Sequence, residues 1–147
     1  MNLTTIGTGI LAFMLLDGIW LGFVMKKFYV TQLAPLGRIV DGGLVPVWWA
    51  AALVYVCLGL GIAAFVVPRA TTLGGAAIFG ALFGLVVYGV YDLTNYSTLT
   101  QWPLGLVAAD MAWGAFASAL VAAAVFSVGA RSFTCPAPTT PVSRPRP

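Results

Sequence analysis

Four long stretches of the chain are almost entirely apolar, and short polar segments separate them. The stretches cover residues 4–25, 44–67, 73–92 and 104–129. A membrane helix needs about 20 mostly apolar residues to cross about 30 Å of hydrocarbon, and each stretch is long enough. Lys26, Pro68 and Pro103 stand at their boundaries, where such residues end or begin a helix. We therefore predict an all-α polytopic membrane protein, a four-transmembrane-helix bundle.

Composition supports this interpretation and excludes two classes of protein. Hydrophobic residues make up 61% of the chain and charged residues 7%, whereas charged residues are about a quarter of an ordinary soluble domain. A water-soluble fold is therefore excluded. The seven lysines and arginines are scattered and form no basic stripe, so no nucleic acid is expected as a partner. The expected surroundings are a lipid bilayer, either a bacterial inner membrane or a plasma membrane.

The two ends of the chain differ in character. No basic segment precedes the first apolar stretch and Asp17 interrupts it, so we expect a membrane helix there rather than a cleavable export signal. The last residues, SFTCPAPTTPVSRPRP, are rich in proline and poor in apolar side chains. We predict a transmembrane domain over residues 1–131 and a disordered tail over 132–147.

Four crossings place both termini on one side of the membrane, together with the turn at Pro68. We call this side the tail face; the side that carries the connections 26–43 and 92–103 is the loop face. Basic residues are nearly balanced between the faces, with a small excess on the tail face (Arg69, Arg131, Arg144 and Arg146, against Lys26, Lys27 and Arg38). The excess favours a cytoplasmic tail face.

Three aspartates lie within or against the apolar stretches. An aspartate at the bilayer centre costs about 2.5–3.5 kcal/mol, so their presence points to a function. The rise of a helix, about 1.5 Å per residue, places Asp17, Asp92 and Asp110 all in the half of the membrane nearer the loop face. We expect Asp17 and Asp110 to face the bundle interior and approach each other, with Asp92 closing the loop-face end. Such a pair shares a proton or a bound cation unless Arg38 reaches it.

Tryptophans and tyrosines repeat this asymmetry. All of them fall in the loop-face half or near the midplane, whereas an ordinary aromatic belt marks both membrane surfaces. These side chains combine an apolar ring with a hydrogen-bond donor. The pattern predicts a cavity that opens toward the loop face.

Two short motifs add detail. LLDGIWLG in the first stretch and AADMAWGA in the fourth each place Trp three residues after Asp, on one helix face, through either a duplication or chance. The segment YGVYDLTNYST is a pocket rim, or a helix end whose side chains satisfy backbone groups. The candidate ligand-binding or proton-binding residues are Asp17, Trp20, Tyr88, Asp92, Thr94, Asn95, Asp110 and Trp113.

No cofactor and no metal ion are expected. The chain has no histidine, and its two cysteines, Cys57 and Cys135, fall at different depths. We expect Cys57 to be a buried, inert thiol. Its helix, the second, offers few polar groups and is predicted to be mainly a packing wall.

The motifs DGIWLG, GALFGLVVYGVYDLTNYSTLTQWP and DMAWG together resemble a family of predicted bacterial integral membrane proteins known only as a domain of unknown function. The resemblance covers about residues 10–115. It implies a small polytopic membrane protein in a context of membrane-lipid modification, and it assigns no activity to any residue.

Three classes of function fit these observations. The first is a module that binds or transports a small molecule, a lipid, a cation or a proton in the predicted cavity. The second is a structural or accessory subunit of a membrane lipid-modifying complex, whose partner is another membrane protein or a second copy of this chain. The third is an enzyme, which we favour least because no Ser-His, Cys-His, HExxH or P-loop arrangement is present. Only aspartate acid–base chemistry would remain for it.

Overall fold

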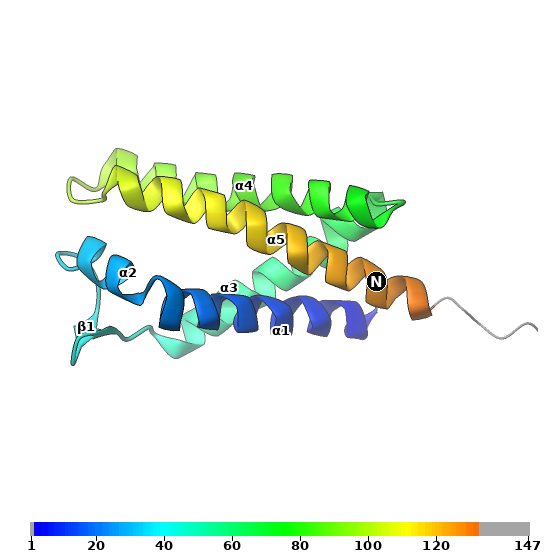
Figure 1. Ribbon diagram of the computed structural model, residues 1–147, viewed down its shortest axis with the longest axis horizontal. Helices are drawn as coiled ribbons and strands as arrows, with labels where there is room; N and C mark the ends of the chain where they lie inside the picture. The colour runs from blue at the N-terminus through cyan, green and yellow to red at the C-terminus, as the bar shows by residue number, and fades with distance from the viewer. Residues whose placement is uncertain (1, 133–147) are drawn as a thin grey trace, which may run out of the picture.

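The computed structural model describes residues 2–132, which form four long helices and a small cap at one end (Figure 1). Helix α1 (Leu3–Ile19) continues through a π-helical turn (Trp20–Val24). Helix α3 (Trp48–Gly61) continues through a π-helical turn (Ile62–Val66) and a short 3₁₀ turn (Val67–Arg69). Helices α4 (Leu73–Thr98) and α5 (Leu104–Ser132) are uninterrupted. Of the expected tail, only Ser132 is described, and the remainder lies outside the described residues.

The four predicted membrane spans are confirmed. Helical segments at Leu3–Val24, Trp48–Arg69, Leu73–Thr98 and Leu104–Gly129 are long and apolar enough to cross a bilayer, with mean hydropathy between 1.7 and 2.5. Large apolar side chains such as Leu11, Leu15, Phe65 and Val86 are each more than 60% exposed on the outside of the bundle. This surface suits lipid rather than water. The protein is therefore an all-α, four-helix polytopic membrane protein.

Two of the helices differ from their predicted ranges. Helix α3 begins at Trp48 rather than at 44, because Leu44 pairs with Ile39 and Val47 is extended after Pro46. Helix α4 runs to Thr98 rather than ending at 92, since neither proline nor glycine occurs between Asp92 and Pro103. The change in hydropathy does not coincide with the start of α3 or with the end of α4. Hydropathy therefore locates these two boundaries poorly.

The cap at the loop face consists of a short helix and a hairpin. Helix α2 (Lys26–Gln32) follows α1 directly, and strands β1 (Ile39–Val40) and β2 (Gly43–Leu44) pair in antiparallel register. Asp41 and Gly42 at the hairpin turn have φ angles of 50° and 72°. An Asp-Gly pair with both φ angles positive is favoured in two-residue hairpin turns.

The bundle core lies where α5 packs against both α4 and α1. Phe13, Ile62, Val121 and Val125 are fully buried there. Small residues let α4 and α5 approach closely: a Cβ added to Gly84 would collide with the Gly114 carbonyl. Packing of this kind holds helices together in lipid, where burial of apolar surface gives no advantage.

Helix α3 leaves this core as it approaches the loop face (Figure 1). Its π-helical end contacts α4 and α5, whereas Trp48–Gly61 packs mainly against α1. Its divergence separates α3 from α4 at the loop face, whereas the end of α1 stays in contact with α5 through the stacked rings of Trp20 and Trp113. Cys57 lies on this divergent part and is exposed, so the expectation of a buried thiol was wrong. Cys57 is on the exposed side of α3, whereas Leu58 beside it is buried in the core.

Candidate binding cavity

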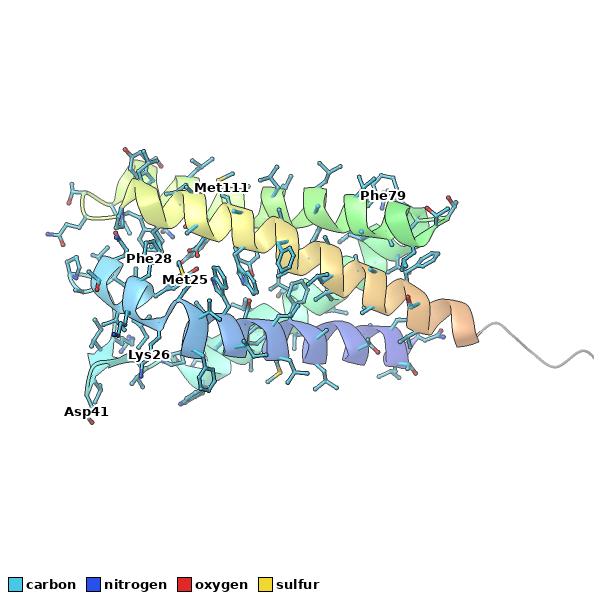
Figure 2. All side chains as sticks on the ribbon, in the orientation of Figure 1. Met25, Lys26, Phe28, Asp41, Phe79 and Met111 are labelled. Carbon is cyan, nitrogen blue, oxygen red and sulfur yellow. The ribbon has the colours of Figure 1, made fainter. Side chains whose placement is uncertain are left out.

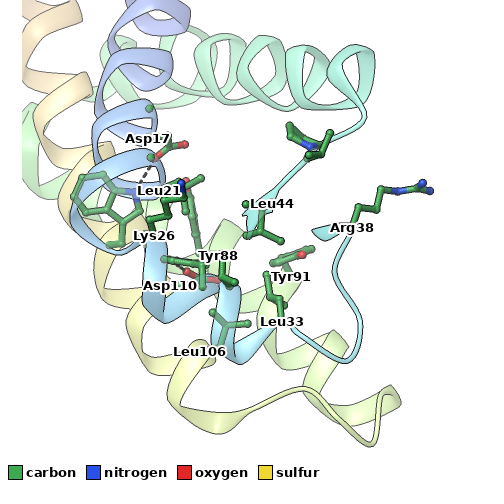
Figure 3. Close-up of a pocket in the computed structure, with 18 of the residues that line it drawn as sticks. Asp17, Leu21, Lys26, Leu33, Arg38, Leu44, Tyr88, Tyr91, Leu106 and Asp110 are labelled. Atoms are coloured by element: carbon green, nitrogen blue, oxygen red, sulfur yellow. Dashed lines mark hydrogen bonds between the residues drawn. The ribbon is translucent and has the colours of Figure 1, made fainter. Parts of the chain in front are cut away.

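A cavity of about 770 Å³ occupies the loop-face half of the bundle, where α3 diverges (Figure 3). Side chains from α1, α3, α4 and α5 form its wall, and α2 and the hairpin cover it. Its main polar and aromatic lining residues are Asp17, Tyr29, Tyr55, Tyr88, Tyr91, Trp102, Asp110 and Trp113, with Lys26 and Arg38 among the remaining lining residues. Much of the apolar surface comes from Leu21, Leu33, Leu44 and Leu106.

Asp17 is anchored by an aromatic donor from another helix. It is 6% exposed, and Oδ1 accepts a hydrogen bond of 2.7 Å from the indole nitrogen of Trp113 on α5 (Figure 3). The ring of Trp113 stacks on Trp20, with centroids 4.2 Å apart and planes within 2° of parallel. Tyr55 on α3 also faces the Asp17 carboxyl. The stacked pair therefore holds the donor in place.

Asp110 is anchored through an intermediate tyrosine. The Trp20 indole nitrogen donates to the Tyr29 hydroxyl at 3.2 Å, and that hydroxyl donates to Asp110 Oδ1. The two Asp-x-x-Trp motifs are thus connected crosswise: Trp113 bonds Asp17 directly, and Trp20 reaches Asp110 through Tyr29. The side chains of the two motifs therefore form one network.

Tyr29 lies outside the membrane spans, on α2, and only 5% of it is exposed. Burial, and then its hydrogen bond to Asp110, raise the pKa of the Tyr29 hydroxyl well above its ordinary value. The hydroxyl therefore keeps its proton at physiological pH. It acts as a permanent donor to Asp110.

Asp92 lies behind Asp110, away from the cavity lining. It is fully buried, and neither carboxyl oxygen has a hydrogen-bond partner. The carboxyl of Asp110 and the indole of Trp102 face it, and the Trp102 nitrogen is also buried without a partner. The direct carboxyl neighbour of Asp110 is thus Asp92, while Asp17 lines another part of the same cavity.

The candidate residues from the sequence divide into three groups in the structure. Asp17, Tyr88, Asp110 and Trp113 line the cavity. Trp20 and Asp92 lie behind this lining and contact it. Thr94 and Asn95 are not among the lining residues: Thr94 is exposed, and its carbonyl accepts the hydroxyls of Ser97 and Thr98. At Thr94 the structure matches the alternative of a helix end that satisfies its own backbone.

Several lining residues were not among the sequence candidates. Tyr29 and Leu44 belong to the connection between the first two spans, whose fold over the bundle hydropathy does not indicate. Tyr55 lines the cavity from α3, so this helix is more than a packing wall. The asymmetric distribution of tyrosines contained the signal, since Tyr29, Tyr55 and Tyr91 all belong to the loop-face half.

The basic residues of the cap do not neutralise the carboxyls. Arg38 extends away from Asp17 and Asp110 (Figure 3). Lys26 lies along the hairpin, where its Cε is 3.9 Å from the position of a Cβ on Gly43. The alternative in which Arg38 reaches the carboxyls is therefore not seen in the structure. The inner part of the cavity is acidic and aromatic, and the positive charges lie at its rim.

Fold and cavity together define a polytopic membrane protein with a mainly apolar and aromatic cavity, containing two carboxyls, in one half of its bundle. The chain belongs to the family described as predicted membrane protein (DUF2177), whose model matches residues 3–127. This confirms the resemblance seen in the sequence motifs. No curated protein and no solved structure is detectably similar to the chain.

Proposed function

We propose that this protein binds one amphipathic molecule of the membrane, with the polar end of that molecule at Asp17 and Asp110. The observation that carries the proposal is the cavity itself, in which two carboxyls face a space otherwise lined mainly by apolar and aromatic side chains. Its volume, about 770 Å³, is in the range of small-molecule sites, about 300–1,000 Å³. An apolar pocket with a few convergent polar groups is the usual form of a ligand site.

The polar groups of the cavity favour a ligand whose polar end is positively charged or donates hydrogen bonds. An ionised carboxyl only accepts hydrogen bonds, and two oxygens give it room for more than one donor. Asp17 and Asp110 each accept one bond at Oδ1, from Trp113 and Tyr29. Aromatic faces next to carboxyls attract ammonium groups, and Tyr55, Tyr88 and Trp113 are among the aromatic residues that line the cavity. We therefore assign an organic cation as the preferred polar end.

The divergence of α3 from α4 supports entry from the bilayer. Trp48 at the start of α3 is 75% exposed, and Tyr91 near the end of α4 is 56% exposed, yet both line the cavity. The space between these helices thus connects the cavity with the lipid-facing surface. An apolar chain occupies this opening while the polar end stays inside.

The proposed orientation follows from the basic residues of the whole chain. Their small excess on the tail face favours a cytoplasmic tail face in the inner or plasma membrane. In this orientation the cavity lies in the outer half of the bilayer. A ligand from the outer leaflet then reaches it without crossing the membrane.

Photolabelling tests the proposed function. The probe is dodecyltrimethylammonium carrying a diazirine on its chain, added to the protein in phosphatidylcholine nanodiscs. We expect labelled peptides from α1, α3 and α4 around the cavity, and competition by unlabelled dodecyltrimethylammonium but not by dodecanoate. Labelling spread evenly over the lipid-facing surface would contradict the proposal.

A variant with a reduced cavity, compared with a matched control variant, gives a second test of the proposed function. Gly22 lines the cavity and a Cβ added there meets nothing within 4 Å, so we expect Gly22→Leu to reduce the cavity volume without displacing the backbone. Gly7 on the same helix also has open space but is not among the lining residues. Gly22→Leu should lose the specific labelling, and Gly7→Leu should keep it. Equal labelling of the two variants, with a stoichiometric partner protein in the preparation, would favour an accessory subunit instead.

A further inference from the structure

The fully buried carboxyl of Asp92 has no role in the cavity lining and no hydrogen-bond partner. An ionised carboxyl in such a place costs several kcal/mol unless it is paired. Three buried polar atoms meet here without partners: both Asp92 oxygens and the Trp102 indole nitrogen. Buried polar atoms in native proteins are nearly always satisfied, so this group indicates that the Asp92 carboxyl is either neutral or paired with a positive charge.

The surroundings of Asp92 contain no compensating positive charge among the described residues. Asp110 on α5 faces it directly, and Tyr88 and Tyr91 on its own helix interact with it electrostatically. Tyr29 on α2 and Asp17 on α1 act on Asp110. Lys26 and Arg38 line the cavity but are exposed, and neither is among the groups that act on Asp92. These groups do not offset a negative charge on Asp92, so a proton or a metal ion would be needed to balance it.

A proton fits this position better than a metal ion. Hard cations such as Ca²⁺ take about six to eight oxygen ligands, often several of them carboxylates. Residues 2–132 contain no group of three acidic, histidine or cysteine side chains able to hold a metal. A proton needs only two oxygens. Placed between Asp92 and Asp110, it gives one Asp92 oxygen a partner and leaves the other to accept from Trp102.

We propose that Asp92 and Asp110 form a single proton-binding site, and that its protonation is coupled to occupancy of the adjacent cavity. The site consists of the unpartnered Asp92 carboxyl, the facing Asp110 carboxyl and the Trp102 indole. Asp110 belongs to both the pair and the cavity lining, so it connects them. The coupling rests on the proposed function, whereas the proton site does not.

The sign of the coupling follows from the charge of the occupant. A permanent cation at Asp110 stabilises the fully ionised pair and opposes the shared proton. Raising the pH through the range in which the pair loses its proton therefore strengthens binding of dodecyltrimethylammonium. This probe does not titrate, so the pH dependence belongs to the protein.

Infrared difference spectroscopy tests the proton site without any ligand. We expect the C=O band of a protonated carboxylic acid in the wild-type protein in nanodiscs at neutral pH, and loss of the band at alkaline pH. Asp92→Asn should remove this band, and Asp110→Asn should shift its titration midpoint. Asp41→Asn, in the exposed hairpin turn, should leave it unchanged. A wild-type protein without the band, or a band that Na⁺ or Ca²⁺ abolishes, would overturn the proton site.

Affinity measured against pH tests the coupling. The affinity of the wild-type protein for dodecyltrimethylammonium should rise as the infrared band disappears, and the affinity of Asp92→Asn should be independent of pH over the same range. Parallel pH profiles for the two proteins would overturn the coupling. If the probe fails to bind at all, the proposed function fails, and the infrared result still decides the proton site. Thermal unfolding of each variant shows that it is folded.

Discussion

The indole nitrogen of Trp113 lies 2.7 Å from Asp17 Oδ1, and this bond joins the first helix of the bundle to the last. The two residues are 96 positions apart in the chain. Hydropathy does not explain the presence of Asp17, because a carboxyl without a partner is costly in a membrane helix. The bond shows how the protein keeps a carboxyl at this depth and at the same time orients it toward the cavity.

Replacing Trp113 by phenylalanine tests the value of this bond. Trp113→Phe keeps an aromatic ring against Trp20 but removes the only hydrogen-bond donor that the Trp113 side chain has. We expect the free energy of unfolding in detergent to fall by about 1–2 kcal/mol, as for other buried hydrogen bonds between membrane helices. Trp48→Phe is the control, since Trp48 is 75% exposed. Equal stability of the two variants would mean that the bond contributes nothing.

Two glycines of α4 test the close contact with α5. A Cβ at Gly84 collides with the Gly114 carbonyl, whereas a Cβ at Gly74 meets nothing within 4 Å. Gly84→Ala should lower the unfolding free energy by about 1–3 kcal/mol through overpacking. Gly74→Ala should leave it unchanged or raise it slightly, because alanine favours the helix. Thermal unfolding of both variants in the same detergent measures the difference, and a stable Gly84→Ala protein would contradict the packing.

The raised pKa of Tyr29 predicts a response to alkaline pH. Because the folded protein holds this proton more tightly than the unfolded chain, the resulting stability is present below about pH 10 and is lost as the pH rises further. The unfolding temperature of the wild-type protein should therefore fall above about pH 10. Tyr29→Phe should start lower, since Asp110 loses its donor, and should then fall less steeply. Tyr96→Phe, at an exposed position, should follow the wild-type slope.

Cysteine labelling tests the proposed orientation. In a background without Cys57 and Cys135, Thr100→Cys reports on the loop face and Thr71→Cys on the tail face, and both positions are exposed. A membrane-impermeant maleimide added to intact cells should label Thr100→Cys and should not label Thr71→Cys. The reverse pattern would invert the orientation, and labelling of both before lysis would contradict the four-span topology.

The sequence was sufficient for the fold class because length and hydropathy alone determine which segments can cross a bilayer. It also located the acidic, aromatic half of the bundle, since the cost of a carboxyl in lipid makes Asp17, Asp92 and Asp110 conspicuous. These inferences use the membrane as an external constraint on single residues, and they need no knowledge of how the helices pack.

What the sequence did not predict depends on contacts between distant segments. The fold of residues 26–44 over the bundle brings in Tyr29 and Leu44, and no periodic pattern indicates it. Thr94 and Asn95 were selected because they are polar, but α4 continues past Asp92 and directs Thr94 toward its own helix end. The partner of each carboxyl is likewise not predictable from the chain, because Tyr29 bonds Asp110 from a segment 81 positions away in the sequence.

Equilibrium binding of radiolabelled dodecyltrimethylammonium to the protein in phosphatidylcholine nanodiscs tests the central claim most directly. The account predicts one saturable site per chain in the wild-type protein and in Gly7→Leu. It predicts at least a tenfold lower affinity, the equivalent of about 1.4 kcal/mol, in Gly22→Leu, whose added side chain is expected to narrow the cavity that Gly22 lines. Binding that never saturates, or that is identical in the wild-type protein and Gly22→Leu, would contradict the claim that the cavity at Asp17 and Asp110 is a ligand site.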